Sequence, residues 1–121
     1  MLNRIGQIAV VARDVGRATT FYRDVLGMRL LFEAPPKMSF FDCGGVRLMI
    51  SLPEGEGVDR ASSILYYKVD DIQAVHRTLA ERGVTFMSPP HMVAKLPDHE
   101  LWLADFKDSE GNILALMSEV R

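Results

Sequence analysis

Near its start, the chain has a short apolar run followed by a longer segment in which the apolar residues are spaced as on one face of a helix. The run at 8–12 predicts a strand. In the segment after it, apolar residues recur three and four positions apart, which places them on one face of a helix. Asp14 is the expected N-cap, because its carboxylate can accept the first free N–H groups, and Gly27 can end the helix. The apolar stripe consists of Val15, Ala18, Tyr22, Val25 and Leu26.

The same pattern returns in the second half of the chain. Residues 64–69 predict a strand, Asp71 is the expected cap and Gly83 the expected stop, with a stripe formed by Ile72, Val75 and Leu79. An internal repeat of this kind determines the fold prediction. We therefore predict one domain over 1–121 with two β-α-β-β-β modules: module one at about 4–52, a linker at 53–61 and module two at about 62–121.

Turn signals separate the remaining strands. Gly44-Gly45 suits a tight hairpin turn, and Pro97-Asp98 is the expected turn of a second hairpin. Strands are predicted at 29–34, 38–43 and 46–52 in module one, and at 85–87, 91–96, 100–107 and 113–120 in module two.

Composition narrows the classes of partner. The chain has 121 residues, of which 48% are apolar, a net charge of −2 and a single cysteine. This balance gives no electrostatic case for nucleic acid or an anionic membrane surface. No apolar run reaches the length of a membrane span, and the N-terminus does not have the pattern of a signal peptide. One cysteine excludes an internal disulfide framework, so we expect a cytoplasmic protein.

Three segments carry a resemblance to a known family. The opening IGQIAVVARDVGRATTFYRDVLGM, and within it FYRDVLG at 21–27, is similar to the vicinal oxygen chelate superfamily of glyoxalase I, bleomycin-resistance proteins and extradiol dioxygenases. VDDI at 69–72 and KDSEGN at 107–112 recur at the equivalent places of the second module. The resemblance implies an α+β fold in which the two modules form a cup-shaped, eight-stranded mixed sheet with helices outside and the ligand site inside. It also implies a homodimer.

Strand alternation predicts which side chains face the inside of the cup. In the first strand Gln7, Ala9 and Val11 face inward, and in the fourth Arg47, Met49 and Ser51 do. In the fifth strand, Ile64, Tyr66 and Lys68 face inward. For 100–107 we expect Leu101 and Leu103 against the helices, and Glu100, Trp102, Ala104 and Phe106 inside. In the last strand, Ile113, Ala115 and Met117 are placed inside, partly on the family resemblance.

The resemblance places metal ligands at four related positions, and the repeat locates them here. Gln7 lies seven residues before Asp14, as Ile64 does before Asp71; Met49 and Ala115 each lie four residues after a glycine. Divalent ions of this class prefer imidazole or carboxylate ligands. Ile64 and Ala115 supply none, Met49 is a soft ligand, and Gln7 alone cannot hold an ion. We therefore predict no metal and no cofactor.

Two other groups of residues could carry chemistry. His91 and Glu100 are the candidate acid–base residues, although a hydrogen-bonded structural histidine is an equally good interpretation. Arg47 and Lys68, as inward-facing charges, either pair with Glu100 or Asp42 or meet an anionic ligand. The predicted ligand-binding residues are Gln7, Arg47, Met49, Tyr66, Lys68, His91, Glu100, Trp102 and Ala115.

Apolar walls with a few polar groups are typical of a small-molecule site. We therefore predict binding of a small organic molecule, anionic or aromatic, in a metal-free cup. The alternative is a lyase, isomerase or dioxygenase that uses a non-standard metal site or His91 and Glu100. A third interpretation is a structural or regulatory domain whose cup is filled by its own side chains.

Overall fold

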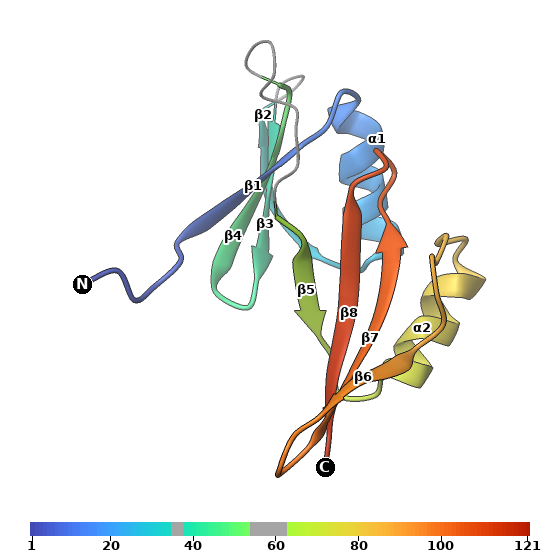
Figure 1. Ribbon diagram of the computed structural model, residues 1–121. Coiled ribbons are helices and arrows are strands. Elements are labelled where there is room, and N and C mark those ends of the chain that lie inside the picture. Colours follow the sequence, from blue (N-terminus) through green and yellow to red (C-terminus); the bar gives the residue numbers. More distant parts are fainter. Residues whose placement is uncertain (35–37, 54–62) are drawn as a thin grey trace. The chain divides into compact units, whose positions relative to one another are not determined.

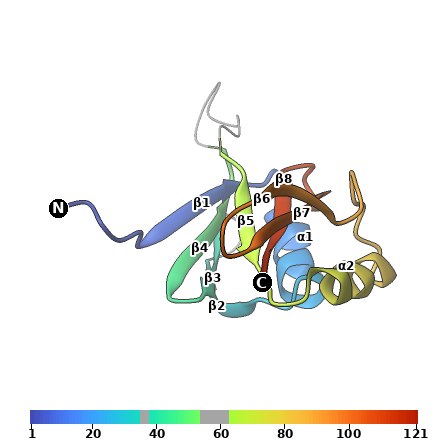
Figure 2. The ribbon, with the colours of Figure 1, turned by 60° about the horizontal axis from the view of Figure 1, so that its bottom comes forward.

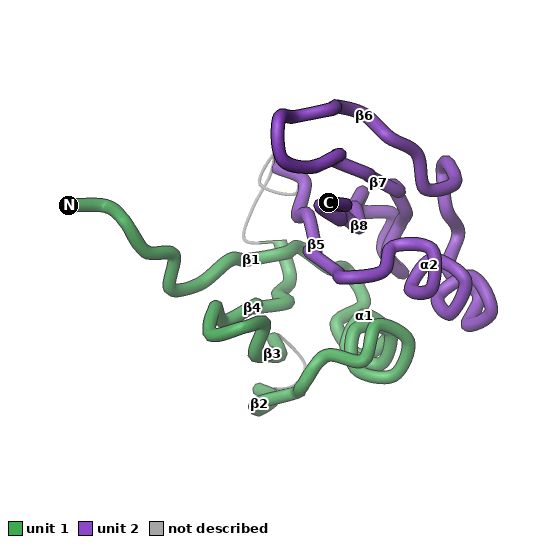
Figure 3. Tube along the Cα trace, turned by 90° about the horizontal axis from the view of Figure 1, so that it is seen from below, with its two compact units in different colours: residues 1–62 green, residues 63–121 purple. Residues whose placement is uncertain are grey.

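The computed structural model describes residues 1–34, 38–53 and 63–121. It divides the chain into two compact units, Met1–Ser62 and Ser63–Arg121 (Figure 3). All but the first residue of the predicted linker lies outside the described residues. Each unit contains one four-stranded mixed sheet and its own helix. The α+β prediction of two β-α-β-β-β modules is confirmed.

Unit 1 forms a sheet in the order β1-β4-β3-β2 (Figure 1). β1 and β4 are parallel, and the other neighbours are antiparallel. A parallel pair needs a crossover, which the helix and the β2–β3 hairpin supply here. The elements are β1 (Gln7–Val11), α1 (Val15–Thr20), η1 (Phe21–Val25), β2 (Arg29–Ala34), β3 (Met38–Cys43) and β4 (Val46–Ser51).

Unit 2 repeats this topology in the order β5-β8-β7-β6, and Figure 2 shows its strands and helix from a second direction. β5 and β8 are parallel, whereas β7 pairs antiparallel with β8 and β6. The elements are β5 (Leu65–Lys68), α2 (Ile72–Glu81), β6 (His91–Lys95), β7 (Glu100–Lys107) and β8 (Ile113–Val120).

The caps and stops predicted for both helices are confirmed. The Asp14 carboxylate accepts the Arg17 N–H at 3.0 Å, and Asp71 accepts the Ala74 N–H at the same distance. Gly27 and Gly83 have φ angles of 74° and 90°, a left-handed conformation that disfavours residues with a Cβ. The first helix differs from the prediction in its second half, because η1 is a π-helical turn rather than a continuation of α1.

The helix face of the unit 1 sheet holds its core. Tyr22 and Phe41 are both fully buried, with ring centroids 6.1 Å apart. The Thr19 and Ser39 hydroxyls lie 2.8 Å apart, so this buried polar pair is satisfied where helix meets strand. Alternation then places the buried residues Leu48 and Ile50 on the same face, as predicted.

The helix face of the unit 2 sheet corrects one prediction. Phe106 contacts Phe86, whose ring in turn lies 4.3 Å from the His76 ring on α2. Phe106 and Ala104 are buried, so the even-numbered residues of β7 face the helix. The prediction that put Leu101 and Leu103 on this face was therefore wrong. Apolar residues occupy both faces of β7, and alternation alone could not distinguish them.

The segment between α2 and β7 is less regular than predicted. The strand expected at 85–87 is only an isolated bridge between Phe86 and Phe106. The second hairpin does turn at Pro97-Asp98, since the Leu96 N–H donates to the His99 carbonyl at 2.8 Å. Farther from the turn, the pairing of β6 with β7 shifts by one residue at Val93, which forms a β-bulge between Met92 and Ala94. Among the helices described, none is long and apolar enough to cross a membrane.

Candidate ligand site

We call the side of each sheet that faces away from its own helix the distal face. Seven predicted ligand residues lie on a distal face, and Glu100 and Trp102 do not. In unit 1 these residues are Gln7, Arg47 and Met49; in unit 2 they are Tyr66, Lys68, His91 and Ala115. Each set belongs to its own four-stranded sheet.

In unit 1 an arginine contacts two neighbours on the distal face, a glutamine and a phenylalanine. The Arg47 Nε donates to the Gln7 Oε1 at 2.7 Å, and its guanidinium carbon lies 5.5 Å from the centre of the Phe40 ring. Gln7 directs its Nε2 at the Met49 sulfur, 3.9 Å away. A cation over an aromatic face is attracted by the ring quadrupole. The guanidinium is therefore fixed in place on an exposed surface.

Sequence reasoning missed two members of this group, Phe32 and Phe40. Their rings stack with centroids 4.4 Å apart and an interplanar angle of 24°. The position of Phe40 could have been predicted from the hairpin that turns at Gly44-Gly45. Because Asp42 pairs with Arg47, Phe40 must lie opposite Met49 on the same face. Phe32 could not be placed in this way, because the β2–β3 register shifts between Leu30 and Phe32.

The family's metal positions can now be tested by their donor chemistry. In unit 1 the Gln7 oxygen already accepts a hydrogen bond from the positively charged Arg47, and the neighbouring position holds the Met49 thioether. A metal ion there would lie next to a guanidinium and have one shared amide oxygen as its hard ligand. In unit 2 the corresponding residues, Ile64 and Ala115, have no donor atoms in their side chains. The four side chains at the family's metal positions therefore do not fit a divalent metal ion.

No alternative metal centre is formed elsewhere in the part of the chain that the structure describes. Within 1–34, 38–53 and 63–121, no three side chains of histidine, cysteine, aspartate or glutamate gather closely enough to hold one ion. His99 instead contacts Asp98 at 2.8 Å, and Asp98 also accepts from Arg121 at 3.2 Å. The His99 and Arg121 contacts hold the pKa of the Asp98 carboxyl below its usual range.

In unit 2 the distal face carries a paired lysine. The Lys68 Nζ lies 3.3 Å from the Glu119 carboxylate, so within unit 2 its partner is Glu119 and not Glu100. Glu119 also accepts from Arg121 at 3.3 Å. Tyr66 is half exposed beside the buried Ala115, which lies opposite it in the parallel β5–β8 pair. Lys68 is therefore partly neutralised, whereas Arg47 has no carboxylate partner among the described residues.

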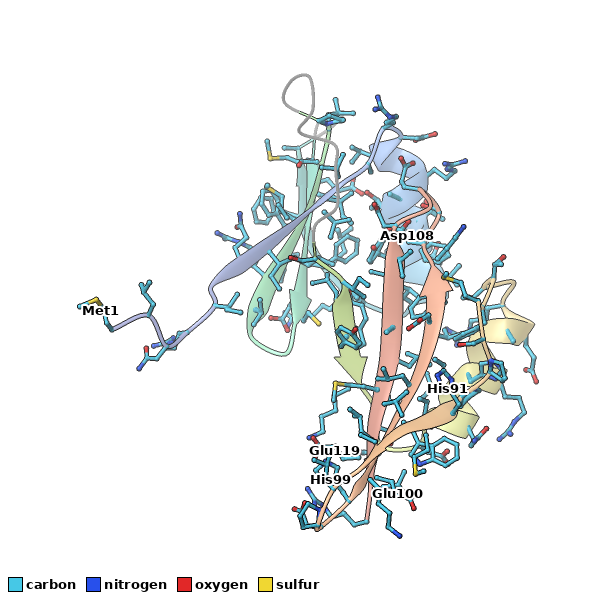
Figure 4. The ribbon with its side chains drawn as sticks, viewed as in Figure 1. Met1, His91, His99, Glu100, Asp108 and Glu119 are labelled. Carbon is cyan, nitrogen blue, oxygen red and sulfur yellow. The ribbon has the colours of Figure 1, made fainter. Side chains whose placement is uncertain are left out.

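The candidate acid–base residues His91 and Glu100 are not brought together. His91 pairs with Leu103 at one end of β6, and Glu100 pairs with Lys95 at the other, on the opposite face (Figure 4). The bulge at Val93 turns His91 to the distal face, whereas Glu100 lies on the helix face. The Glu100 carboxylate accepts the Trp102 Nε1–H at 3.0 Å instead. The His91 Nδ1 lies 2.8 Å from the Pro89 carbonyl oxygen.

Trp102 lies on the helix side of its sheet, beside a hollow of about 390 Å³ at the start of α2. A hollow of about 570 Å³ occupies the equivalent place at the start of α1. Both are lined by the helix caps, and the cap carboxylates of Asp14 and Asp71 already accept N–H groups of their own helices. These hollows repeat with the module and lie on the opposite side of each sheet from Arg47 and Tyr66.

Cys43 does not add a nucleophile to the site. It lies at the end of β3 on the helix side, partly buried. Burial, with a smaller contribution from the neighbouring Asp42 charge, raises the pKa of its thiol. A raised pKa leaves the thiolate scarce at neutral pH, which agrees with a small packing residue.

Sequence comparison relates the chain to a known family. The profile of the Glyoxalase/Bleomycin resistance protein/Dioxygenase superfamily matches residues 4–116. The uncharacterized protein YraH of Bacillus subtilis (strain 168) is 25% identical over 126 residues, which cover 91% of this chain and 94% of that protein.

Solved structures share the fold at low identity. A member of the same superfamily from Sphaerobacter thermophilus DSM 20745 has a TM-score of 0.78 at 24% identity and covers 98% of both chains. A lactoylglutathione lyase from Agrobacterium tumefaciens has a TM-score of 0.74 at 20% identity, covering 95% of this chain and 92% of the lyase. At these identities the likeness establishes the fold alone.

Proposed function

Because the chain belongs to the Glyoxalase/Bleomycin resistance protein/Dioxygenase superfamily, we propose that it binds a small organic molecule without the help of a metal ion. The site is the distal face of the unit 1 sheet. The observation that carries this proposal is the Arg47–Gln7 hydrogen bond of 2.7 Å, which holds a cation directly beside Gln7, a position where the family resemblance would place a metal ligand.

The surroundings of this cation support a binding role. Apolar side chains line the same face, and a few polar groups can fix the orientation of a ligand, as in small-molecule sites generally. The Arg47 side chain is exposed, so its remaining N–H groups are accessible to a ligand. The lyase, isomerase and dioxygenase alternatives gain no support from His91 and Glu100, which lie on opposite faces of one sheet.

The proposal is tested by ligand binding before and after metal removal. Purified protein is dialysed against EDTA, its metal content is measured, and a panel of small organic acids, bases and neutral molecules is screened by thermal unfolding. We expect some members to raise the Tm equally in both samples, because a ligand at about 100 times its Kd stabilises the folded state by about 2.7 kcal/mol.

Two outcomes would contradict this account. The first is stabilisation that depends on added zinc, nickel, iron or manganese and disappears in Gln7→Ala. The second is a panel in which no molecule changes the Tm.

A further inference from the structure

An apolar row crosses all four strands of the unit 1 sheet on its distal face. Phe32 on β2 pairs with Phe40 on β3, Phe40 with Met49 on β4, and Met49 with Ala9 on β1. The first two rings are stacked, and Phe32 remains 51% exposed. Ala9 has only a methyl group, so the side chains of the row project least from the sheet at the β1 end. A flat molecule can lie on such a surface with one face against rings and thioether.

The cation lies beside this row. Arg47 lies two residues before Met49 on β4, on the same face, with Asp42 opposite it on one neighbouring strand and Gln7 on the other. Asp42 directs its Oδ1 to the Gly45 N–H at 3.3 Å. The Arg47 Nε is bonded to Gln7, and within the described residues no carboxylate lies within ion-pair distance of the guanidinium. Its Nη atoms present a planar pair of donors, which matches the two oxygens of a carboxylate.

The second unit serves as an internal comparison. The position of Phe40 is taken there by Asp105, that of Met49 by Ala115 and that of Ala9 by Tyr66, in the same register. Ile113 occupies the place of Arg47. The module therefore folds without this row and without this cation. Folding alone does not account for the two phenylalanines and the arginine of unit 1.

We propose that the distal face of unit 1 binds an aromatic carboxylate, with the ring on the Phe32–Phe40–Met49 row and the carboxylate on the Nη atoms of Arg47. This inference rests on the proposed function and adds the class of ligand. A carboxylate is favoured over a phosphate because one guanidinium supplies one pair of parallel hydrogen bonds and one charge. Lys68 is excluded as the anchor because it already pairs with Glu119.

The test uses phenylacetate as the probe and compares it with three relatives that change one property each. 2-Phenylethanol removes the charge, acetate removes the ring, and phenyl phosphate replaces the carboxylate. Binding to the full chain is measured by calorimetric titration. The variants are Arg47→Gln, Phe40→Leu and, as the matched control, Arg77→Gln on the exposed side of α2. Unfolding midpoints and amide NMR spectra establish that each variant is folded.

We expect phenylacetate to bind the unaltered protein and Arg77→Gln equally. Arg47→Gln should weaken binding at least about tenfold, because a charge-assisted hydrogen-bond pair is lost. Phe40→Leu should weaken it by about threefold or more through loss of the ring surface. Acetate and 2-phenylethanol should both bind at least about tenfold more weakly than phenylacetate, and neither should respond to both substitutions.

The inference is overturned if Arg47→Gln binds phenylacetate as the unaltered protein does, or if 2-phenylethanol or phenyl phosphate binds as tightly as phenylacetate. In these cases the proposed function still stands when other molecules of the wider panel bind the chelated protein. If no molecule of that panel binds, the inference and the proposed function both fail.

Discussion

Replacing Phe41 with alanine should lower the free energy of unfolding by about 3–5 kcal/mol, the range for removing a large ring from a packed core. Phe41 is fully buried on the helix face of β3, against the equally buried Tyr22 of η1. Deleting the ring loses its burial and leaves a cavity that the sheet and helix cannot close completely. Domains of this size have only about 5–15 kcal/mol of total stability, so the variant should unfold at a much lower urea concentration.

Phe32→Ala is the matched control for this change. It removes the same ring from the distal face of the same sheet, where Phe32 is 51% exposed and stacks on Phe40. We expect a loss of about 1 kcal/mol from that contact. Urea unfolding of both variants measures the difference. Equal losses would mean that the two faces of the unit 1 sheet have been assigned incorrectly.

The second large effect concerns the aspartate in the turn between β7 and β8, which has a counterpart near the end of β3. Asp108 is 7% exposed and accepts the N–H groups of Glu110 and Asn112, both at 2.8 Å, and the Asn112 side-chain amide at 2.9 Å. Asp108→Ala leaves these donors without their acceptor. Since hydrogen bonds to a charged group contribute more than neutral ones, we expect a loss of about 3 kcal/mol.

Asp42 in the first module provides the comparison. Its carboxylate accepts the Gly45 N–H at 3.3 Å and is less buried. Asp42→Ala should therefore cost about 1 kcal/mol. Chemical denaturation of the two alanine variants tests this asymmetry. A larger loss for Asp42→Ala than for Asp108→Ala would contradict the hydrogen-bond geometry of the two turns.

The repeated module was predictable because its signals are local. Asp14 and Gly27, and again Asp71 and Gly83, mark the ends of segments with helical spacing, and each is found in the role that its chemistry predicts. The hairpin turns depend on glycine or proline in the same way. The β-strands at 29–34, 38–43, 100–107 and 113–120 were located to the residue. Local turn and cap chemistry was sufficient to predict the repeated module and the order of its elements.

The errors occurred where local signals were missing or conflicting. The apolar residues of β7 lie on both faces, and the polar residues do not separate cleanly either: Asp105 and Lys107 lie on the odd-numbered face and Glu100 on the even-numbered one. No glycine or proline within β6 predicts the bulge at Val93. The partner of Arg47 depends on parallel pairing of β1 with β4, which are far apart in sequence. The homodimer and the cytoplasmic location stay predictions.

The central claim is that a ligand binds on the distal face of unit 1 without a metal. Its most direct test is an NMR titration of EDTA-treated protein, labelled at methionine and alanine methyl groups, with phenylacetate. The account predicts that the Met49 and Ala9 methyl signals shift together and saturate, while Ala12, buried on the helix side of the same unit, does not respond. A titration that shifts Ala12 but leaves Met49 and Ala9 unchanged, or one that requires added metal, would contradict it.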